Sequence, residues 1–234
     1  MADAFRAERA TRSEVQVREF IQQVYGWMAA ALALTGFVAL AVSRTPAIQR
    51  VIFGSPIVFF GLIIGELALV MWLVTRIGRM SASTATSVFV GYSALNGVTL
   101  SSIFLVYAQA TIAQAFFVTA GVFGVMTLYG FFTKTDLTKL GNILGMALVG
   151  FIIASLVNLF LRSEGLYWLI TYAGVAIFTG LVAYDSQRIK EMALAGAGEE
   201  QESGRKYAVM GALRLYLDFV NLFLLLLRIF GRRQ

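Results

Sequence analysis

The sequence contains neither cysteine nor histidine. Disulfide frameworks, Cys/His zinc sites and catalytic arrangements built on either residue are therefore excluded. Charged residues are also scarce, at 14% of the chain, whereas a soluble globular domain has about 25%. A Gly-rich phosphate loop and a nucleophile elbow are missing too. We therefore predict that the protein is not an enzyme and holds no tightly bound cofactor.

Apolar residues dominate what is present, at 59% of the 234 residues. A helix crosses the apolar core of a bilayer, about 30 Å thick, with roughly 20 apolar residues, and runs of this kind recur through most of the chain. The pattern predicts an all-α membrane protein whose seven transmembrane helices form one bundle. The expected spans are Phe20–Val42, Pro56–Val74, Thr84–Tyr107, Thr111–Phe132, Ile143–Leu161, Leu166–Tyr184 and Tyr207–Phe230.

The first 19 residues are polar and carry four arginines. The apolar run after them is longer than the core of a signal peptide, about 7 to 15 residues, so we expect a retained anchor. Residues 1–19 are predicted to form a cytoplasmic tail and residues 20–234 a single membrane domain. The Lys and Arg residues would number 12 in the inner segments and 6 in the outer ones, which favours a cytoplasmic N-terminus. These Lys and Arg residues lie in short loops and tails and form no basic face, so nucleic acid is not an expected partner.

The end of the chain fits this topology less well. Its last segment, RIFGRR, carries Arg228, Arg232 and Arg233, which would prefer the inner side if the segment were re-entrant. Before it, SQRIKEMAL is predicted to continue the sixth helix into water, and the acidic loop Gly196–Lys206 is predicted to end that helix. Asp185 would then lie inside a helix.

Glu66 is an acid near the middle of the second predicted span. About 15 Å of helix separates it from either end, too far for its short side chain to reach water. Ionisable residues at this depth are costly and usually line an ion or proton path. The alternative is a protonated Glu66 that forms a hydrogen bond with a neighbouring helix.

A mostly polar stripe lies on one face of the last span. Its residues are spaced by four, three, four and three positions, which places them on a single helical face, and all except Leu225 are polar: Arg214, Asp218, Asn221, Leu225 and Arg228. A polar stripe on an otherwise apolar helix is accommodated best inside a bundle, where it faces a cavity or other polar helices. The alternative is an Arg214–Asp218 pair that only neutralises itself.

Asp185 stands at the inner end of the sixth predicted span. One alternative is a salt bridge with Arg188, one helical turn later. However, the sixth and seventh helices run in opposite directions, so Asp185 and Asp218 share the inner half of the membrane and could meet. Two carboxylates at short range in a low dielectric share a proton and titrate together.

Several segments resemble the Bax-inhibitor-type family, also called the transmembrane Bax inhibitor motif family, and its bacterial branch in particular. The most specific are FTGLVAYDSQRIK and ALRLYLDFVNLFLLLLRIFG, and the others are QVYGWM, YSALNGVTLSSIF and GVFGVMTLYGFFTKTDL. The resemblance implies a bacterial inner-membrane location and a fold with the last helix central, between two layers of three helices. It also implies that Asp185 and Asp218 form a pH sensor. Glu66 and Arg76 match the family's second-helix acid and gating arginine less tightly.

The resemblance further implies a pH-sensitive calcium leak channel, with the lipid bilayer, calcium and protons as partners. Calcium prefers six to eight oxygen ligands, so Asp185 and Asp218 predict at most a weak site for a permeant ion. If Arg76 pairs with Asp185 in one state, loss of that pair could free the helices to separate. The main alternative is a regulator of a membrane-bound AAA protease without transport activity. An intramembrane aspartyl protease is disfavoured, because Asp218 stands in YLDF rather than in GxGD.

Overall fold

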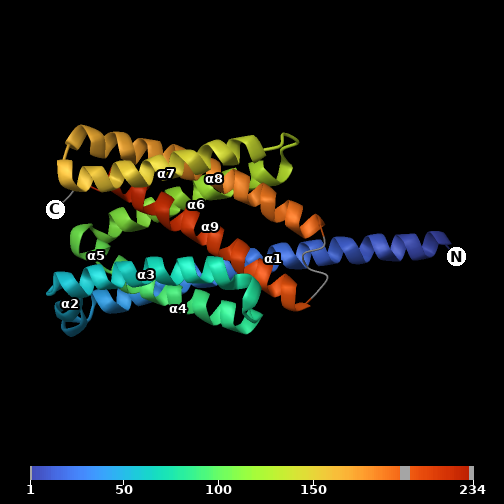
Figure 1. Ribbon diagram of the computed structural model, residues 1–234, viewed down its shortest axis with the longest axis horizontal. Helices are drawn as coiled ribbons and strands as arrows, with labels where there is room; N and C mark the ends of the chain where they lie inside the picture. Colours follow the sequence, from blue (N-terminus) through green and yellow to red (C-terminus); the bar gives the residue numbers. More distant parts are fainter. Residues whose placement is uncertain (1, 196–200, 232–234) are drawn as a thin grey trace. The chain divides into compact units, whose positions relative to one another are not determined.

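The computed structural model describes residues 2–195 and 201–231, and every regular element in these ranges is a helix (Figure 1). Seven described segments are long and apolar enough to cross a membrane: Glu14–Ser43, Pro56–Arg79, Ala82–Val106, Gln109–Phe132, Thr138–Leu161, Glu164–Leu194 and Glu202–Phe230. Each overlaps one of the spans predicted from the sequence. The protein is therefore an all-α membrane protein, as predicted.

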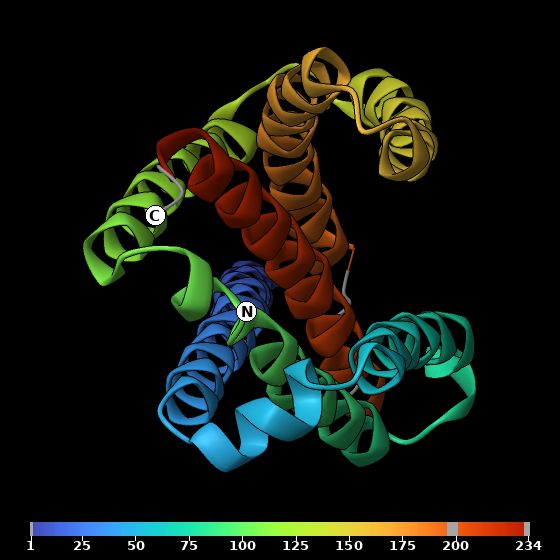
Figure 2. The same cartoon turned by 90° about the vertical axis from the view of Figure 1, so that its left-hand side faces the viewer.

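The helices pack as two compact units. The first contains the described residues up to Val106 together with those from Lys190 to Tyr216. Within it α1 packs against α4, and α4 packs against α3 (Figures 1 and 2). Its helices are α1 (Ala2–Ser43), α2 (Pro46–Phe53), α3 (Pro56–Arg76), the short 3-10 helix η1 (Ile77–Arg79), α4 (Ala82–Leu100), α5 (Ile103–Val106), the end of α8 (Glu164–Leu194) and the first half of α9 (Gln201–Phe230).

The second unit contains the described residues from Tyr107 to Ile189 and from Leu217 onward. Its helices are α6 (Gln109–Phe132), α7 (Thr138–Leu161), most of α8 (Glu164–Leu194) and the second half of α9 (Gln201–Phe230). Buried side chains of α8 and α9 form its apolar core, and partly buried side chains of α6 and α7 pack against them. Gly130 allows α6 to approach α8, because a Cβ atom there would collide with the Ala183 carbonyl and lie 3.0 Å from the Ser186 Cβ.

The spans differ greatly in burial. In the apolar 18-residue stretch of α9, 72% of the residues are buried, whereas none of the residues in the equivalent stretch of α7 is buried. Large apolar side chains such as Phe160, which is 84% exposed, cover α7, as expected for a helix that faces lipid. The burial of α9 agrees with the prediction that the last helix is an interior one.

Two connections between the spans contain helix, and for the second of them the sequence predicts a loop. The link after the first span contains the helix α2, because Pro46 occupies its first turn, where a fixed φ and a missing N–H suit a helix start. The loop predicted to run to Lys206 is helical from Gln201, and residues 196–200 lie outside the described residues. The Glu202 carboxylate accepts a hydrogen bond of 2.6 Å from the Ala82 N–H at the start of α4, a favourable place for a negative charge.

Other boundaries agree with the sequence. Helix α8 continues to Leu194, so Asp185 lies inside a helix, as predicted. Helix α1 runs without a break from Ala2 to Ser43 and so passes through the predicted boundary at residue 20. The division into a cytoplasmic tail and one membrane domain stays a prediction. Arg232 and Arg233 of the discordant C-terminal segment lie outside the described residues.

Candidate functional site

Glu66 is buried on a helix that is otherwise mostly exposed. Its side chain is 9% exposed, and it is held by α4, on which Asn96 Nδ2 donates to Glu66 Oε2 at 3.2 Å and the Thr99 hydroxyl donates to Glu66 Oε1. Glu66 thus has hydrogen-bond partners on a neighbouring helix and accepts in both bonds; the protonated state suggested as one alternative stays a prediction. A place for Glu66 on an ion path stays a prediction.

The hydrogen bonds continue from Glu66 to two further helices of the first unit. Tyr216 of α9, which is fully buried, donates to Asn96 Oδ1 at 3.1 Å and lies 2.7 Å from the hydroxyl of Thr35 on α1. Thr35 in turn donates to the Ser93 carbonyl oxygen at 2.8 Å. We call these five residues, Thr35, Glu66, Asn96, Thr99 and Tyr216, the Glu66 network. It joins α1, α3, α4 and α9 through polar groups.

Tyr216 is fixed in this network by aromatic contacts as well. Its ring packs edge-on against Phe89 and Tyr92 of α4, with centroid distances of 5.8 and 5.9 Å. A buried tyrosine is well placed when its ring is packed and its hydroxyl has a polar partner, and Tyr216 has both. The hydroxyl position is therefore determined by packing as well as by hydrogen bonds.

The hydrogen atoms of the network do not suffice for all of its contacts at once. The hydroxyls of Thr35 and Tyr216 carry one hydrogen each, but they make three contacts, with Asn96, with each other and with the Ser93 carbonyl. If the Asn96 amide turns by half a rotation, its NH2 donates to Tyr216 and each of these contacts has a donor. Its oxygen then faces Glu66 and accepts a hydrogen bond only from a protonated Glu66. Hydrogen counting therefore allows a second arrangement of the network, which contains one more proton.

Asp185 and Asp218 lie in the second unit, on α8 and α9, and are 8% and 5% exposed. Near them the two helices share a buried apolar cluster of Ile177, Phe178, Leu181, Leu222, Leu225 and Leu226. On α8, Asp185 comes four positions after Leu181, and on α9, Asp218 comes four positions before Leu222. Four positions are about one helical turn, so on antiparallel helices the two aspartates would be level. That their carboxyl groups meet stays a prediction.

Gln187, two residues after Asp185, was not singled out in the sequence. It is 8% exposed, and its amide binds the α6–α7 connection with both of its polar atoms. Oε1 accepts from the Leu137 N–H at 2.8 Å, and Nε2 donates to the Thr135 carbonyl at 2.9 Å. Gln187 therefore fixes this connection to the same turn of α8 that carries Asp185.

The predicted charge partners lie at exposed positions. The side chains of Arg76 on α3 and Arg214 on α9 are exposed, and their pairing with the buried acids stays a prediction. Arg188 donates to the Tyr184 hydroxyl at 2.7 Å. Asn221, in the middle of the polar stripe, is half-buried and donates to the Leu217 carbonyl of its own helix at 2.8 Å.

The described residues contain no group of three or more acidic side chains able to hold a metal ion. Asp185 and Asp218 belong to one unit and Glu66 to the other. A calcium ion at Asp185 and Asp218 would take two carboxylates from the described chain, fewer than the several that a tight site gathers. These donors suit a weakly held ion.

Sequence reasoning located the buried acids but missed the polar residues around Glu66. A usable signal was present, since Tyr92, Asn96 and Thr99 recur at spacings of four and three, which places them on one helical face. The same periodicity revealed the stripe on the last helix. Thr35 had no comparable signal, because a single threonine in an apolar helix commonly bonds to its own backbone.

Comparisons with known proteins identify the family of the chain and agree with a membrane protein. A family model described as "Inhibitor of apoptosis-promoting Bax1" matches residues 17–234. The inner membrane protein YbhL of Escherichia coli K12 is 49% identical over 229 residues, which cover 98% of each chain. An uncharacterized protein of Borreliella burgdorferi is 45% identical over 95% of this chain and 96% of its own. Another, from Rickettsia prowazekii, is 41% identical over 93% and 91%. The chain therefore belongs to the Bax-inhibitor family of membrane proteins.

Proposed function

We propose that the protein is a pH-sensitive calcium (cation) leak channel of the bacterial inner membrane, with a cytoplasmic N-terminus. The observation that carries this proposal is the burial of three carboxylic acids, Glu66, Asp185 and Asp218, on membrane-spanning helices. Such residues are expensive in a bilayer and usually serve ion or proton movement. The relative in Escherichia coli is named an inner membrane protein, which supports the location.

Asp185 and Asp218 are the proposed pH sensor. Both are buried beside the apolar contact between α8 and α9, where two carboxylates at the same level would share one proton, because two adjacent negative charges are strongly opposed in a low dielectric. Loss of the proton would push the helices apart or recruit a cation. Arg76 is the proposed partner of Asp185 in one of the two states. A packed helix contact that has two arrangements converts such a local charge change into opening or closing.

The Glu66 network supplies a second proton-dependent element. Protonation of Glu66 favours the arrangement in which Asn96 donates to Tyr216, and its loss favours the other. Tyr216 stands only two residues before Asp218 on α9, so one helix carries both elements. We propose that α9 responds to both protonation events.

Calcium would pass as a weakly bound ion. Conduction requires that an ion enter a site and also leave it. A site with only two carboxylates would bind calcium weakly enough for the ion to leave. Asp185 and Asp218 are the proposed ligands in transit.

The test is calcium flux into liposomes that contain the purified full-length protein, measured with a trapped fluorescent indicator over a series of pH values. The wild-type protein is expected to give flux that changes with pH. Asp185→Asn and Asp218→Asn should shift or remove the pH response while the protein remains inserted, because each removes a titrating group at nearly constant volume. Asp136→Asn is the matched control, since Asp136 is an exposed acid in the α6–α7 connection.

An unchanged pH response in both variants would contradict the sensor assignment. Absence of wild-type flux at every pH would contradict the channel itself. If an AAA protease also co-purified with the protein, the alternative of a protease regulator without transport activity would be favoured.

A further inference from the structure

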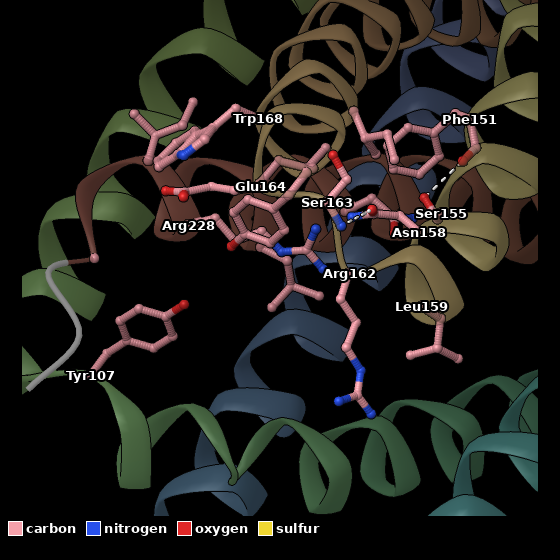
Figure 3. Close-up of a pocket in the computed structure, with 17 residues that line it drawn as sticks. Tyr107, Phe151, Ser155, Asn158, Leu159, Arg162, Ser163, Glu164, Trp168 and Arg228 are labelled. Carbon is pink, nitrogen blue, oxygen red and sulfur yellow. Dashed lines mark hydrogen bonds between the residues drawn. The ribbon is translucent and has the colours of Figure 1, made fainter.

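A large pocket in the second unit is not used by the proposed channel mechanism. It lies where α7 ends, α8 begins and α9 ends (Figure 3), and it has a volume of about 1180 Å³. Pockets for small ligands usually measure about 300–1,000 Å³. The pocket therefore has room for a ligand larger than an ion or a simple metabolite.

One side of the pocket is polar and carries more positive than negative charge. Arg162, Arg228 and Glu164 line it, and the Arg228 guanidinium lies 5.6 Å from the centre of the Tyr167 ring. Guanidinium groups are well suited to phosphate, because they present several N–H donors in a fixed plane. Trp168 lines the same pocket, and Trp and Tyr are typical of the headgroup level of a membrane.

The rest of the lining is mostly apolar but includes the polar Ser155, Asn158 and Asn221. Its apolar side chains come from all three helices, namely Phe151, Leu159, Ile170, Leu224 and Leu225. Ile170 and Leu225 are only 6% and 3% exposed, so this apolar wall reaches into the protein. A pocket with both cationic and apolar lining suits the two parts of a phospholipid.

The backbone at Arg162 is a second, independent observation. Among the described residues, Arg162 is the one non-glycine residue with a positive φ, 51°, at the C-terminal cap of α7. Glycine is the residue that normally occupies such a position. Asn158 stabilises the turn, because its backbone oxygen accepts from Arg162 N–H and its Oδ1 accepts from Ser163 N–H at 3.0 Å. The turn thus holds Arg162 at the C-terminal end of α7, where a cationic side chain also interacts favourably with the helix dipole.

We propose that this pocket binds one phospholipid, with its phosphodiester at Arg228 and Arg162 and an acyl chain along the apolar wall. Two arginines at the edge would repel calcium, so the pocket does not suit a cation entrance. Glu164 beside them would accept a hydrogen bond from a hydroxyl or ammonium group of the headgroup. This inference does not depend on the proposed leak activity.

The test counts the lipids retained by the full-length protein. The protein is reconstituted in bilayers of phosphatidylglycerol and phosphatidylethanolamine, extracted into a mild detergent and examined by native mass spectrometry. The variants are Arg228→Gln and Arg162→Gly, with Arg50→Gln as the control because Arg50 is an exposed arginine on α2, outside the pocket. Melting temperatures report folding, and inorganic phosphate is added as a competitor.

We expect one retained phospholipid on the wild-type protein and on Arg50→Gln. Retention by Arg228→Gln and by Arg162→Gly should fall about tenfold, as expected for the loss of one charge-assisted hydrogen bond. Arg162→Gly should melt at an equal or higher temperature, because glycine suits the backbone there, which separates lost binding from lost folding. Wild-type retention in both variants would overturn the proposal, as would displacement of the lipid by millimolar inorganic phosphate, which would show a site for a free anion.

Discussion

Tyr216→Phe removes a single hydroxyl from the centre of the Glu66 network. The ring would keep its edge-on contacts with Phe89 and Tyr92, so the change isolates the hydrogen bonds. Two contacts are lost, the one to Thr35 at 2.7 Å and the one to Asn96 at 3.1 Å, and both are hydrogen bonds when the Asn96 NH2 group donates to Tyr216. Both connect α9 to another helix of the same unit.

The expected loss of stability follows from these two bonds. Hydrogen bonds between membrane helices contribute about 0.6 kcal/mol on average and about 1.7 kcal/mol at most. Two of them give roughly 1–3 kcal/mol. Tyr216 is fully buried, and Asn96 would lose its bond to Tyr216, whereas Thr35 would keep its bond to the Ser93 carbonyl. The change should therefore lower the unfolding free energy measurably without preventing folding.

The assay is reversible unfolding in mixed detergent micelles, combined with a double-mutant cycle between Tyr216→Phe and Asn96→Ala. Residues in direct contact should show a coupling energy of about 0.5 kcal/mol or more. Tyr207→Phe is the control, since Tyr207 is a tyrosine on the same helix that is 49% exposed. Equal stability losses at the two tyrosines, or additive effects of Tyr216→Phe and Asn96→Ala, would refute the network.

Gln187→Leu should release the α6–α7 connection and lower the free energy of unfolding by about 1–3 kcal/mol, because the buried Leu137 N–H and the Thr135 carbonyl lose their hydrogen bonds to Gln187. The measurement is the rate of proteolysis at residues 133–137, which should rise, with Arg188→Gln as the control. Equal cleavage rates in the two variants would contradict this role of Gln187. Reporter fusions at residues 1 and 234 should place the N-terminus in the cytoplasm and the C-terminus on the opposite side. A C-terminal reporter in the cytoplasm would indicate a re-entrant last segment, and an N-terminal reporter active only outside would overturn the topology.

The number and positions of the spans could be predicted from the distribution of apolar residues along the chain. A bilayer allows only segments that satisfy their own backbone hydrogen bonds, so long apolar runs such as Pro56–Val74 leave little choice but a helix. The same argument identified Glu66, Asp185 and Asp218 as exceptional, because an ionisable side chain in the apolar core of a membrane is energetically costly. The predicted connections were less accurate. Helix α2 begins with Pro46 in its first turn, and the helical segment from Gln201 is in contact with α4 through Glu202; apolar content reports neither feature.

The sequence by itself determined that this is a seven-span helical protein with three acids at depth, because these features follow from the chain's transfer into an apolar solvent. Only the tertiary structure decided which side chains meet. Thr35 and Tyr216 are separated by 181 positions, and Gln187 reaches a connection about 50 residues away. Such contacts depend on helix rotation and register, which packing between helices sets. A polar residue in an apolar span therefore indicates that a partner exists, while the fold alone decides which residue it is.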